Sequence, residues 1–240
     1  IYSDDVLLKR LTIIIVLSIG LLVLSEQTEF DVWIMTFVYD PNISGFPFKG
    51  NWWLKDFLHD GGRRGIFTVA LICLIWLIIS LVWRPSRKYR VPSALLLISM
   101  IFTTASVATI KYSSDIHCPY DLLEYGGRYQ RTGLVEYATA SQTSGRCWPG
   151  GHASAGFCLW AFYFVGLIYW RRWIQWAFWI PLFVGIFFGS VQILRGAHFF
   201  THTLWTGLLV WSINVFLFTF VALISDRRTL NLRTANCDKS

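Results

Sequence analysis

Charged residues are scarce in this sequence of 240 residues, of which Asp, Glu, Lys and Arg together make up only 15%. A soluble domain usually carries about a quarter. Hydrophobic side chains account for 55% of the chain, which excludes an ordinary soluble domain and indicates a surface that faces lipid. Acidic residues are the scarcer sign, 14 against 21 Lys and Arg, so the net charge is +7.

A basic stripe is also missing, because the Lys and Arg residues stand in short clusters between hydrophobic runs. Nucleic-acid binding is therefore not expected. No internal repeat or low-complexity segment divides the chain, so we expect one membrane domain over residues 1–240. The first hydrophobic run lacks a small-residue cleavage site, since Ser25-Glu26-Gln27 follows it, and we expect it to remain as a helix.

Six hydrophobic stretches are long enough to cross a bilayer, which takes about 20 mostly apolar residues in a helix. They are residues 9–25, 65–84, 92–110, 153–170, 173–191 and 203–224. The sequence therefore predicts an all-α polytopic membrane protein, a six-transmembrane-helix bundle.

The Lys and Arg residues between these stretches predict the orientation. With six spans, four basic clusters fall on one side: Lys9 and Arg10, then Arg84, Arg87, Lys88 and Arg90, then Arg171 and Arg172, and finally Arg227, Arg228, Arg233 and Lys239. By the positive-inside rule that side is cytoplasmic. We therefore expect both termini in the cytoplasm, loops 26–64 and 111–152 on the periplasmic face, and a location in a bacterial inner membrane.

All five histidines fall on the predicted periplasmic side: His59, His117, His152, His198 and His202. A shared polar site at that interface explains this better than scattered surface histidines. His117 is expected to be structural. His59 lies in the segment His59-Asp60-Gly61-Gly62-Arg63, which is either a turn before the second span or a further part of the same mouth.

Two of the five cysteines, Cys118 and Cys147, share the outer loop 111–152. An oxidising periplasm permits a disulfide between them. We predict that bridge, with two free thiols or a metal pair as the alternatives.

Three short polar segments reach the same side. They are Lys111 at the end of the third span, Pro149-Gly150-Gly151-His152 at the start of the fourth, and Arg195-Gly196-Ala197-His198-Phe199-Phe200-Thr201-His202 before the sixth. Glycines at a helix start let backbone N–H groups approach an anion, and Lys and Arg supply positive charge. Two imidazoles can divide a phosphoryl transfer, one attacking phosphorus and the other protonating the departing oxygen. If the third segment is helical, Arg195, His198 and His202 share one face.

In this order the motifs resemble the signature of the type 2 phosphatidic acid phosphatase (PAP2) superfamily, whose usual pattern is Lys-x6-Arg-Pro, Pro-Ser-Gly-His and Ser-Arg-x5-His-x3-Asp. The resemblance covers about residues 111–205 in motif terms, together with the six-helix topology. It implies that His198 is the nucleophile that forms a phosphohistidine and that His152 is the general acid. It also implies that Lys111, Gly151 and the third-motif Arg hold the phosphate, with no metal or other cofactor.

Four positions depart from that pattern: Cys118 replaces the first-motif Arg, Gly150 the Ser, Gln192 the third-motif Arg, and His202 the Asp. Arg195, one turn closer, is the expected substitute for Gln192. The other candidate substitutes are Arg128, Arg131 and Arg146 for the first-motif Arg, and Asp115 and Asp121 for the carboxylate. A neutral His202 can still accept the N–H of His198 and orient it.

The function that these residues favour is a lipid phosphatase, because a site at the interface admits a head group while the hydrocarbon chain stays in the bilayer. Lipid A, phosphatidic acid, phosphatidylglycerol phosphate and undecaprenyl pyrophosphate are the candidate substrates, and the motifs do not select among them. A lipid phosphotransferase with the same residues is one alternative. A non-catalytic lipid-binding or transport protein is the other, although few ionisable residues stand at mid-depth where a transport path usually needs them.

Overall fold

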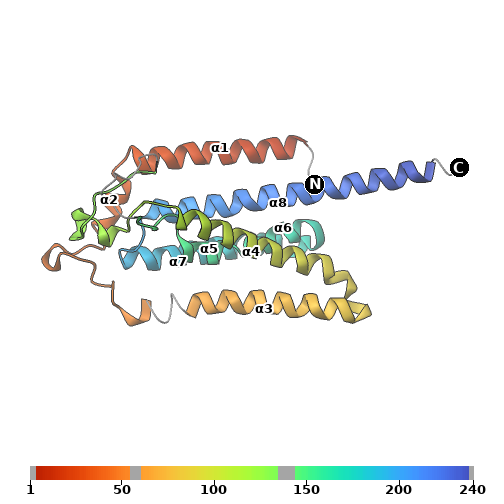
Figure 1. Cartoon of the computed structure of the whole chain (residues 1–240), viewed down its shortest axis with the longest axis horizontal. Helices are drawn as coiled ribbons and strands as arrows, with labels where there is room; N and C mark the ends of the chain where they lie inside the picture. Colours follow the sequence, from red (N-terminus) through yellow and green to blue (C-terminus); the bar gives the residue numbers. More distant parts are fainter. Residues whose placement is uncertain (1–3, 55–60, 135–143, 238–240) are drawn as a thin grey trace.

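The computed structural model describes residues 4–54, 61–134 and 144–237, with side chains up to residue 225. Its helices lie side by side in an elongated bundle (Figure 1). The helices are α1 (Asp4–Glu26), α2 (Phe30–Met35), α3 (Gly61–Val82), α4 (Arg90–Tyr112), α5 (Gly151–Phe157), α6 (Trp160–Tyr169), α7 (Ile174–Leu194) and α8 (Phe200–Cys237). Six segments are long and apolar enough to cross a membrane, which confirms the predicted all-α six-span architecture.

The predicted spans match these helices except at some boundaries. The span predicted at 153–170 consists of α5 and α6, because the chain tightens at Cys158–Leu159, where Leu159 N–H donates to the Gly156 carbonyl three residues back. α3 ends at Val82 rather than at residue 84. Trp83 is extended there, and a short 3₁₀ helix with Pro85 near its start follows at Arg84–Tyr89.

Small residues allow the central helices to approach closely. A Cβ added at Gly156 of α5 would lie 2.5 Å from the Gly185 backbone nitrogen of α7. The Phe157 ring fills the space that a side chain at Gly185 would occupy, and it is 2% exposed. The glycines therefore hold α5 against α7, as expected for helices that associate without a hydrophobic driving force in lipid.

The two ends of the bundle differ in what they carry. At the left end in Figure 1 lie α2, the end of α4 and the starts of α5 and α8. At the right end lie the start of α1, the connection from α3 to α4 with its basic cluster, and the end of α8. The six spans thus bring Lys111, His152 and His198 to one end and the basic clusters to the other. That the first end faces the periplasm remains a prediction.

A second, smaller core covers the end that carries the histidines. Met35, Phe46, Leu122, Tyr125, Ile193 and Phe199 are buried together there. The disulfide between Cys118 and Cys147 is formed as predicted, with Cα atoms 5.1 Å apart, and it closes the loop between α4 and α5. The loops at this end are therefore a packed layer that fixes the backbone around His198.

Candidate active site

The cradle, by which we mean Lys111, Gly150, Gly151 and His198, lies where α4, α5 and the α7–α8 turn meet. A Cβ placed on Gly151 would lie 3.9 Å from Cδ of Lys111, and one placed on Gly150 would lie 3.9 Å from Cδ2 of His198. The bare glycine backbone therefore lies between the lysine stem and the imidazole. That these glycines let an anion approach the backbone stays a prediction.

Gly150 and Gly151 differ in what their amides do. The Gly150 N–H donates to Thr206 Oγ1 at 2.8 Å, and the Thr206 hydroxyl donates to the His202 carbonyl at 2.7 Å. The Gly150 amide is thus used to join α5 to α8 and is not directed at an anion. Gly151 is the first residue of α5, so its N–H has no intrahelical acceptor and is the better-placed donor for a phosphate.

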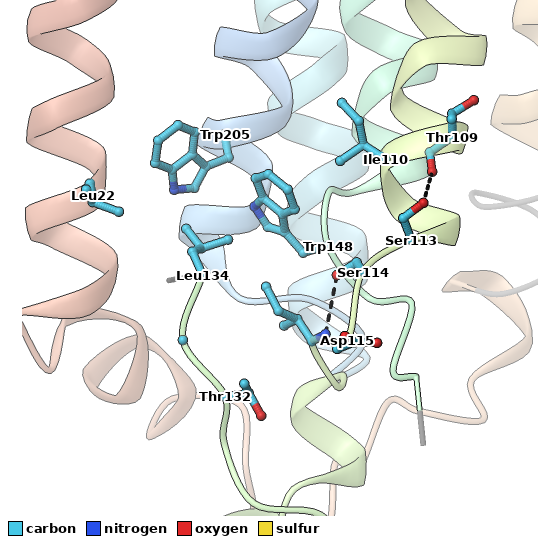
Figure 2. A pocket seen from close by; sticks show the side chains of 12 residues that line it. Leu22, Thr109, Ile110, Ser113, Ser114, Asp115, Thr132, Leu134, Trp148 and Trp205 are labelled. Atoms are coloured by element: carbon cyan, nitrogen blue, oxygen red, sulfur yellow. Dashed lines mark hydrogen bonds between the residues drawn. The ribbon is translucent and has the colours of Figure 1, made fainter. Parts of the chain in front are cut away.

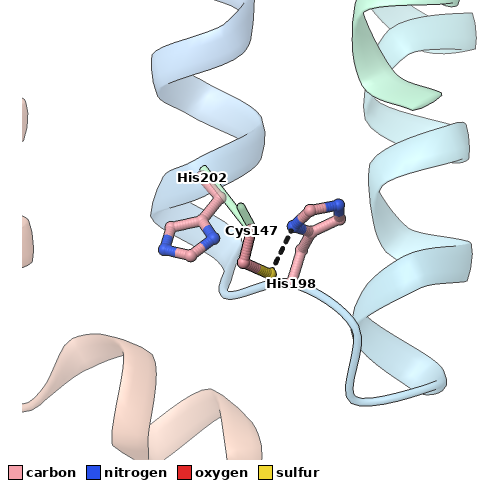
Figure 3. A group of neighbouring side chains, drawn as sticks. All are labelled: Cys147, His198 and His202. Carbon is pink, nitrogen blue, oxygen red and sulfur yellow. Dashed lines mark hydrogen bonds between the residues drawn. The ribbon is translucent and has the colours of Figure 1, made fainter. Parts of the chain in front are cut away.

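His198 lies in the turn between α7 and α8 and is 4% exposed. Its Nδ1 is 3.4 Å from Cys147 Sγ, and the other ring nitrogen points away from the sulfur (Figure 3). Because this sulfur is in the disulfide, it carries no proton, and only the imidazole can donate. Nε2 is then the unprotonated nitrogen, as a nucleophile requires.

The surroundings of His198 favour its neutral form. Burial lowers the pKa of His198 well below its ordinary value, and the nearby charges of Lys111, His202 and His152 lower it further. The Cys147 backbone carbonyl opposes these effects. At neutral pH the imidazole is therefore uncharged, and Lys111 and His152 are close enough to act on its charge.

His202 does not make the contact that was expected of it. It lies in the first turn of α8 and is 5% exposed, and its ring centroid is 5.8 Å from that of His198. Its Nδ1 is buried without a hydrogen-bond partner among the described residues. Since His198 directs Nδ1 to Cys147 instead, the orienting role predicted for His202 has no hydrogen bond to support it in the described part of the chain.

Residues 195–202 do not form one helix, so the condition under which Arg195, His198 and His202 would share a face is not met. Arg195 ends α7, and Gly196 has a φ of +67°, which breaks the helix before α8 begins. A side chain at Gly196 would collide with the Phe46 ring, so both the backbone angle and the packing require glycine there. Arg195 donates from Nη1 to Gln192 Oε1 at 3.2 Å, and its Nε is buried without a partner.

A buried carboxylate that the sequence reasoning missed lies beneath this turn. Asp31 of α2 is 2% exposed and accepts hydrogen bonds from the Thr201 amide, at 3.0 Å, and from the Thr201 hydroxyl. It therefore caps the start of α8. Burial raises the pKa of Asp31, although Thr201 and the charge of Arg131 oppose this. The only local signal was a single acidic residue within the apolar segment Phe30–Met35.

Of the candidate substitutes for the first-motif Arg, Arg131 is the one placed beside a site imidazole. It lines a small cavity of about 30 Å³ together with Asp31 and His202, and its guanidinium lies 4.9 Å from the Phe199 ring centroid. Arg146 instead stacks on Tyr112 at 4.1 Å.

The remaining candidates lie elsewhere. Arg128 donates its backbone N–H to the Asp121 carbonyl. Burial raises the pKa of Asp121, and the charges of Lys49 and His117 oppose this. The charged groups that act on Asp121 are therefore not cradle residues. Asp115 is exposed. His117 stacks on Tyr129 with centroids 3.8 Å apart, and His59 lies outside the described residues.

Two larger cavities lie at this end of the bundle in the described part of the chain. One of about 740 Å³ opens between α1, α4 and α8, where Trp148 and Trp205 form its inner wall (Figure 2). The other, of about 280 Å³, is a groove between α3, α4 and α5 that Ile66, Phe67, Met100 and Ile101 line, and it also includes Lys111 and Gly151. The second groove therefore joins the lipid-facing surface to the cradle.

Cys147, His198 and His202 also meet the spacing of a metal site, because their ligand atoms lie within 4.8 Å of one another. The Cys147 sulfur is bonded to Cys118 and cannot act as a thiolate. Two imidazoles remain, fewer than the three protein ligands of catalytic zinc sites.

Comparison with known proteins supports the interpretation of the motifs. The family model described as PAP2 superfamily matches residues 92–225, more than half of the chain. The matched region runs from α4 into α8 and includes Lys111, His152 and His198. No curated protein and no solved structure matches the chain.

Proposed function

Because this chain belongs to the PAP2 superfamily, whose members are phosphatases, we propose that it removes phosphate from a lipid head group through a phosphohistidine on His198. The observation that carries the proposal is the arrangement around His198. A buried, neutral imidazole has Nδ1 held by Cys147, and its Cδ2 edge faces the Gly150–Gly151 backbone beside Lys111.

In the first half-reaction Nε2 of His198 attacks phosphorus, and the bond from phosphorus to the lipid oxygen breaks. His152 gives its proton to the departing oxygen, so the lipid leaves as an alcohol or as a lipid phosphate. The Lys111 ammonium and the Gly151 amide balance the charge on the phosphoryl oxygens. Arg195 is the third donor, since its buried Nε has no partner among the described residues.

In the second half-reaction His152 takes a proton from water, and the water oxygen attacks the phosphohistidine. The P–N bond breaks, inorganic phosphate leaves, and Nε2 regains its lone pair. We propose that no metal takes part, because fixed cations and amides perform the charge balance.

A lipid substrate is supported by the groove between α3 and α4. Its lining is largely apolar, it opens where both helices expose hydrophobic side chains, and it includes Lys111. A hydrocarbon chain in this groove would place its phosphate at the cradle. The Cys118–Cys147 disulfide supports a cradle on the periplasmic side, because disulfides persist in oxidising compartments.

The test is phosphate release by the purified protein in detergent, with phosphatidic acid, phosphatidylglycerol phosphate, lipid A or undecaprenyl pyrophosphate as substrate. We expect release from at least one lipid, undiminished by EDTA, and a loss of about a thousandfold or more in His198→Ala and His152→Ala. His117→Gln, outside the cradle, is the control and should keep its activity within a few-fold.

Two outcomes would change the assignment. Activity that EDTA abolishes and a divalent cation restores contradicts the metal-free mechanism. Phosphate that appears on a second lipid instead of in solution identifies a phosphotransferase with the same nucleophile.

A further inference from the structure

We propose that the Cys118–Cys147 disulfide is a positioning element for the nucleophile and supplies the orienting contact that the usual PAP2 pattern assigns to an Asp at position 202. The inference rests on the proposed function, since it concerns how His198 is held for attack. It gives the disulfide a part in the chemical step beyond closing a loop.

The disulfide touches the turn that carries His198 at two points. Cys147 Sγ lies 3.4 Å from His198 Nδ1 and 2.9 Å from the carbonyl oxygen of Ala197, the preceding residue. Cys147 is fully buried, and its partner Cys118 stands where the family has its first-motif Arg. The bridge therefore replaces one motif residue while its other end contacts the nucleophile.

The chemistry of the sulfur decides which ring nitrogen of His198 carries the proton. A disulfide sulfur has lone pairs but no hydrogen, so a stable contact with Nδ1 requires the N–H on that nitrogen. The Cys147 backbone carbonyl also interacts with this imidazole, and it favours the form that donates. The contact with the sulfur selects the tautomer whose Nε2 lone pair is free for phosphorus.

The described residues offer no carboxylate that takes this role. Asp31, the buried carboxylate that packs against this turn, accepts hydrogen bonds from Thr201 with both of its oxygens. His202, at the position of the family's Asp, leaves Nδ1 without a partner. The orienting group for His198 is therefore neutral, and its contribution should be smaller than that of a buried carboxylate, whose loss from a catalytic triad costs about 10⁴ in kcat.

The test compares three variants with the wild-type chain, with folded fraction checked by thermal unfolding. Cys118→Ala/Cys147→Ala removes the bridge and the contact, and we expect kcat to fall about tenfold with KM little changed. Cys118→Ala/Cys147→Ser also lacks the bridge but returns a lone-pair acceptor, and it should recover part of kcat. Adding His202→Asp to the double-alanine variant should recover more. Cys73→Ala, a free cysteine in α3, is the matched control.

A bridge that acted only as a cross-link would give a different pattern. The alanine and serine variants would then lose activity equally, and His202→Asp would restore nothing. That result, or an unchanged kcat in the double-alanine variant, overturns the inference and leaves the lipid phosphatase standing. A wild-type protein inactive on every lipid phosphate overturns the proposed function and this inference with it.

A second measurement needs no disulfide variant to fold. Nitrogen-15 NMR of histidine-labelled protein in detergent, with His198→Gln to assign the signal, reports which ring nitrogen is protonated. We expect the proton of His198 on Nδ1 at neutral pH. A proton on Nε2 overturns the inference whatever the activity.

Discussion

At the scale of single residues, His198 shows how burial prepares a nucleophile. An imidazole removed from water resists protonation, and the cation at Lys111 adds to that resistance. Burying a neutral imidazole takes little free energy when Nδ1 has a polar contact, and Cys147 provides that contact. Burying the ring becomes unfavourable in free energy only when the ring carries a positive charge.

The pH dependence of the reaction follows from this environment. Because the pKa of His198 is lowered, the ring is largely unprotonated at pH 6.5, where an ordinary imidazole is half protonated, and the acid limb of kcat/KM should lie below that pH. His202→Asp would place a carboxylate near the ring and stabilise its protonated form, so the acid limb should move to higher pH. The pH–rate profiles of the two proteins measure this. An acid limb at or above pH 6.5 in the wild-type protein, or a downward shift in the variant, contradicts the account.

The sequence identified Lys111, His152 and His198 because each stands in a motif whose spacing and residue types carry the chemistry. It did not identify Asp31 or the contact from Cys147. Both act through chain segments distant in sequence, Asp31 on Thr201 and Cys147 on His198, and no local pattern records which loop will pack on which turn.

At the scale of elements, the start of α8 depends on a cap supplied by α2. The Thr201 amide donates to the Asp31 carboxylate, and a capping residue contributes about 1 kcal/mol to stability. Asp31→Ala should therefore lower the unfolding temperature of the detergent-solubilised protein by a few degrees, and Asp31→Asn, which keeps an acceptor oxygen, by less. Unfolding temperatures equal to that of the wild-type protein in both variants would show that the cap does not stabilise the fold.

The groove between α3 and α4 makes a separate prediction about substrate length. Ala108 lines it one turn before Lys111, so Ala108→Phe should raise KM for a long-chain lipid phosphate about tenfold or more while changing KM for a short-chain soluble analogue little. Ala105→Phe, an exposed position on α4 outside the groove lining, is the matched control. The measurement is the ratio of KM for the long-chain lipid phosphate to KM for the short-chain analogue. If Ala108→Phe leaves this ratio unchanged, the groove is excluded as the binding path of the hydrocarbon chain.

The membrane-spanning helices could be predicted from the sequence, but the turn between α7 and α8 could not. Long apolar runs leave a helix as the only way to pair the backbone in lipid, so the spans could be read from composition. The turn at 195–199 lies at an interface where helix and turn both satisfy the backbone. Packing of Phe46 against Gly196 decides between them, and that contact joins segments about 150 residues apart.

At the scale of the whole molecule, the six spans separate the cradle from the basic clusters. Because Lys and Arg resist translocation, we predict that the end carrying α8's C-terminus is cytoplasmic. A green fluorescent protein fused to the C-terminus should then fluoresce, and alkaline phosphatase fused at the same place should be inactive. The opposite pattern would place the cradle on the cytoplasmic side, where a reducing compartment does not favour the disulfide.

The central claim is that His198 carries the phosphoryl group during turnover, and direct trapping of that group tests it. Protein turning over a lipid substrate labelled with radioactive phosphate is quenched in alkaline detergent, in which phosphohistidine survives, and the labelled peptide is sequenced by mass spectrometry. The account predicts an acid-labile label on His198 that is missing in His198→Ala. Phosphate release without any label on the protein, or a label on another residue, would contradict it.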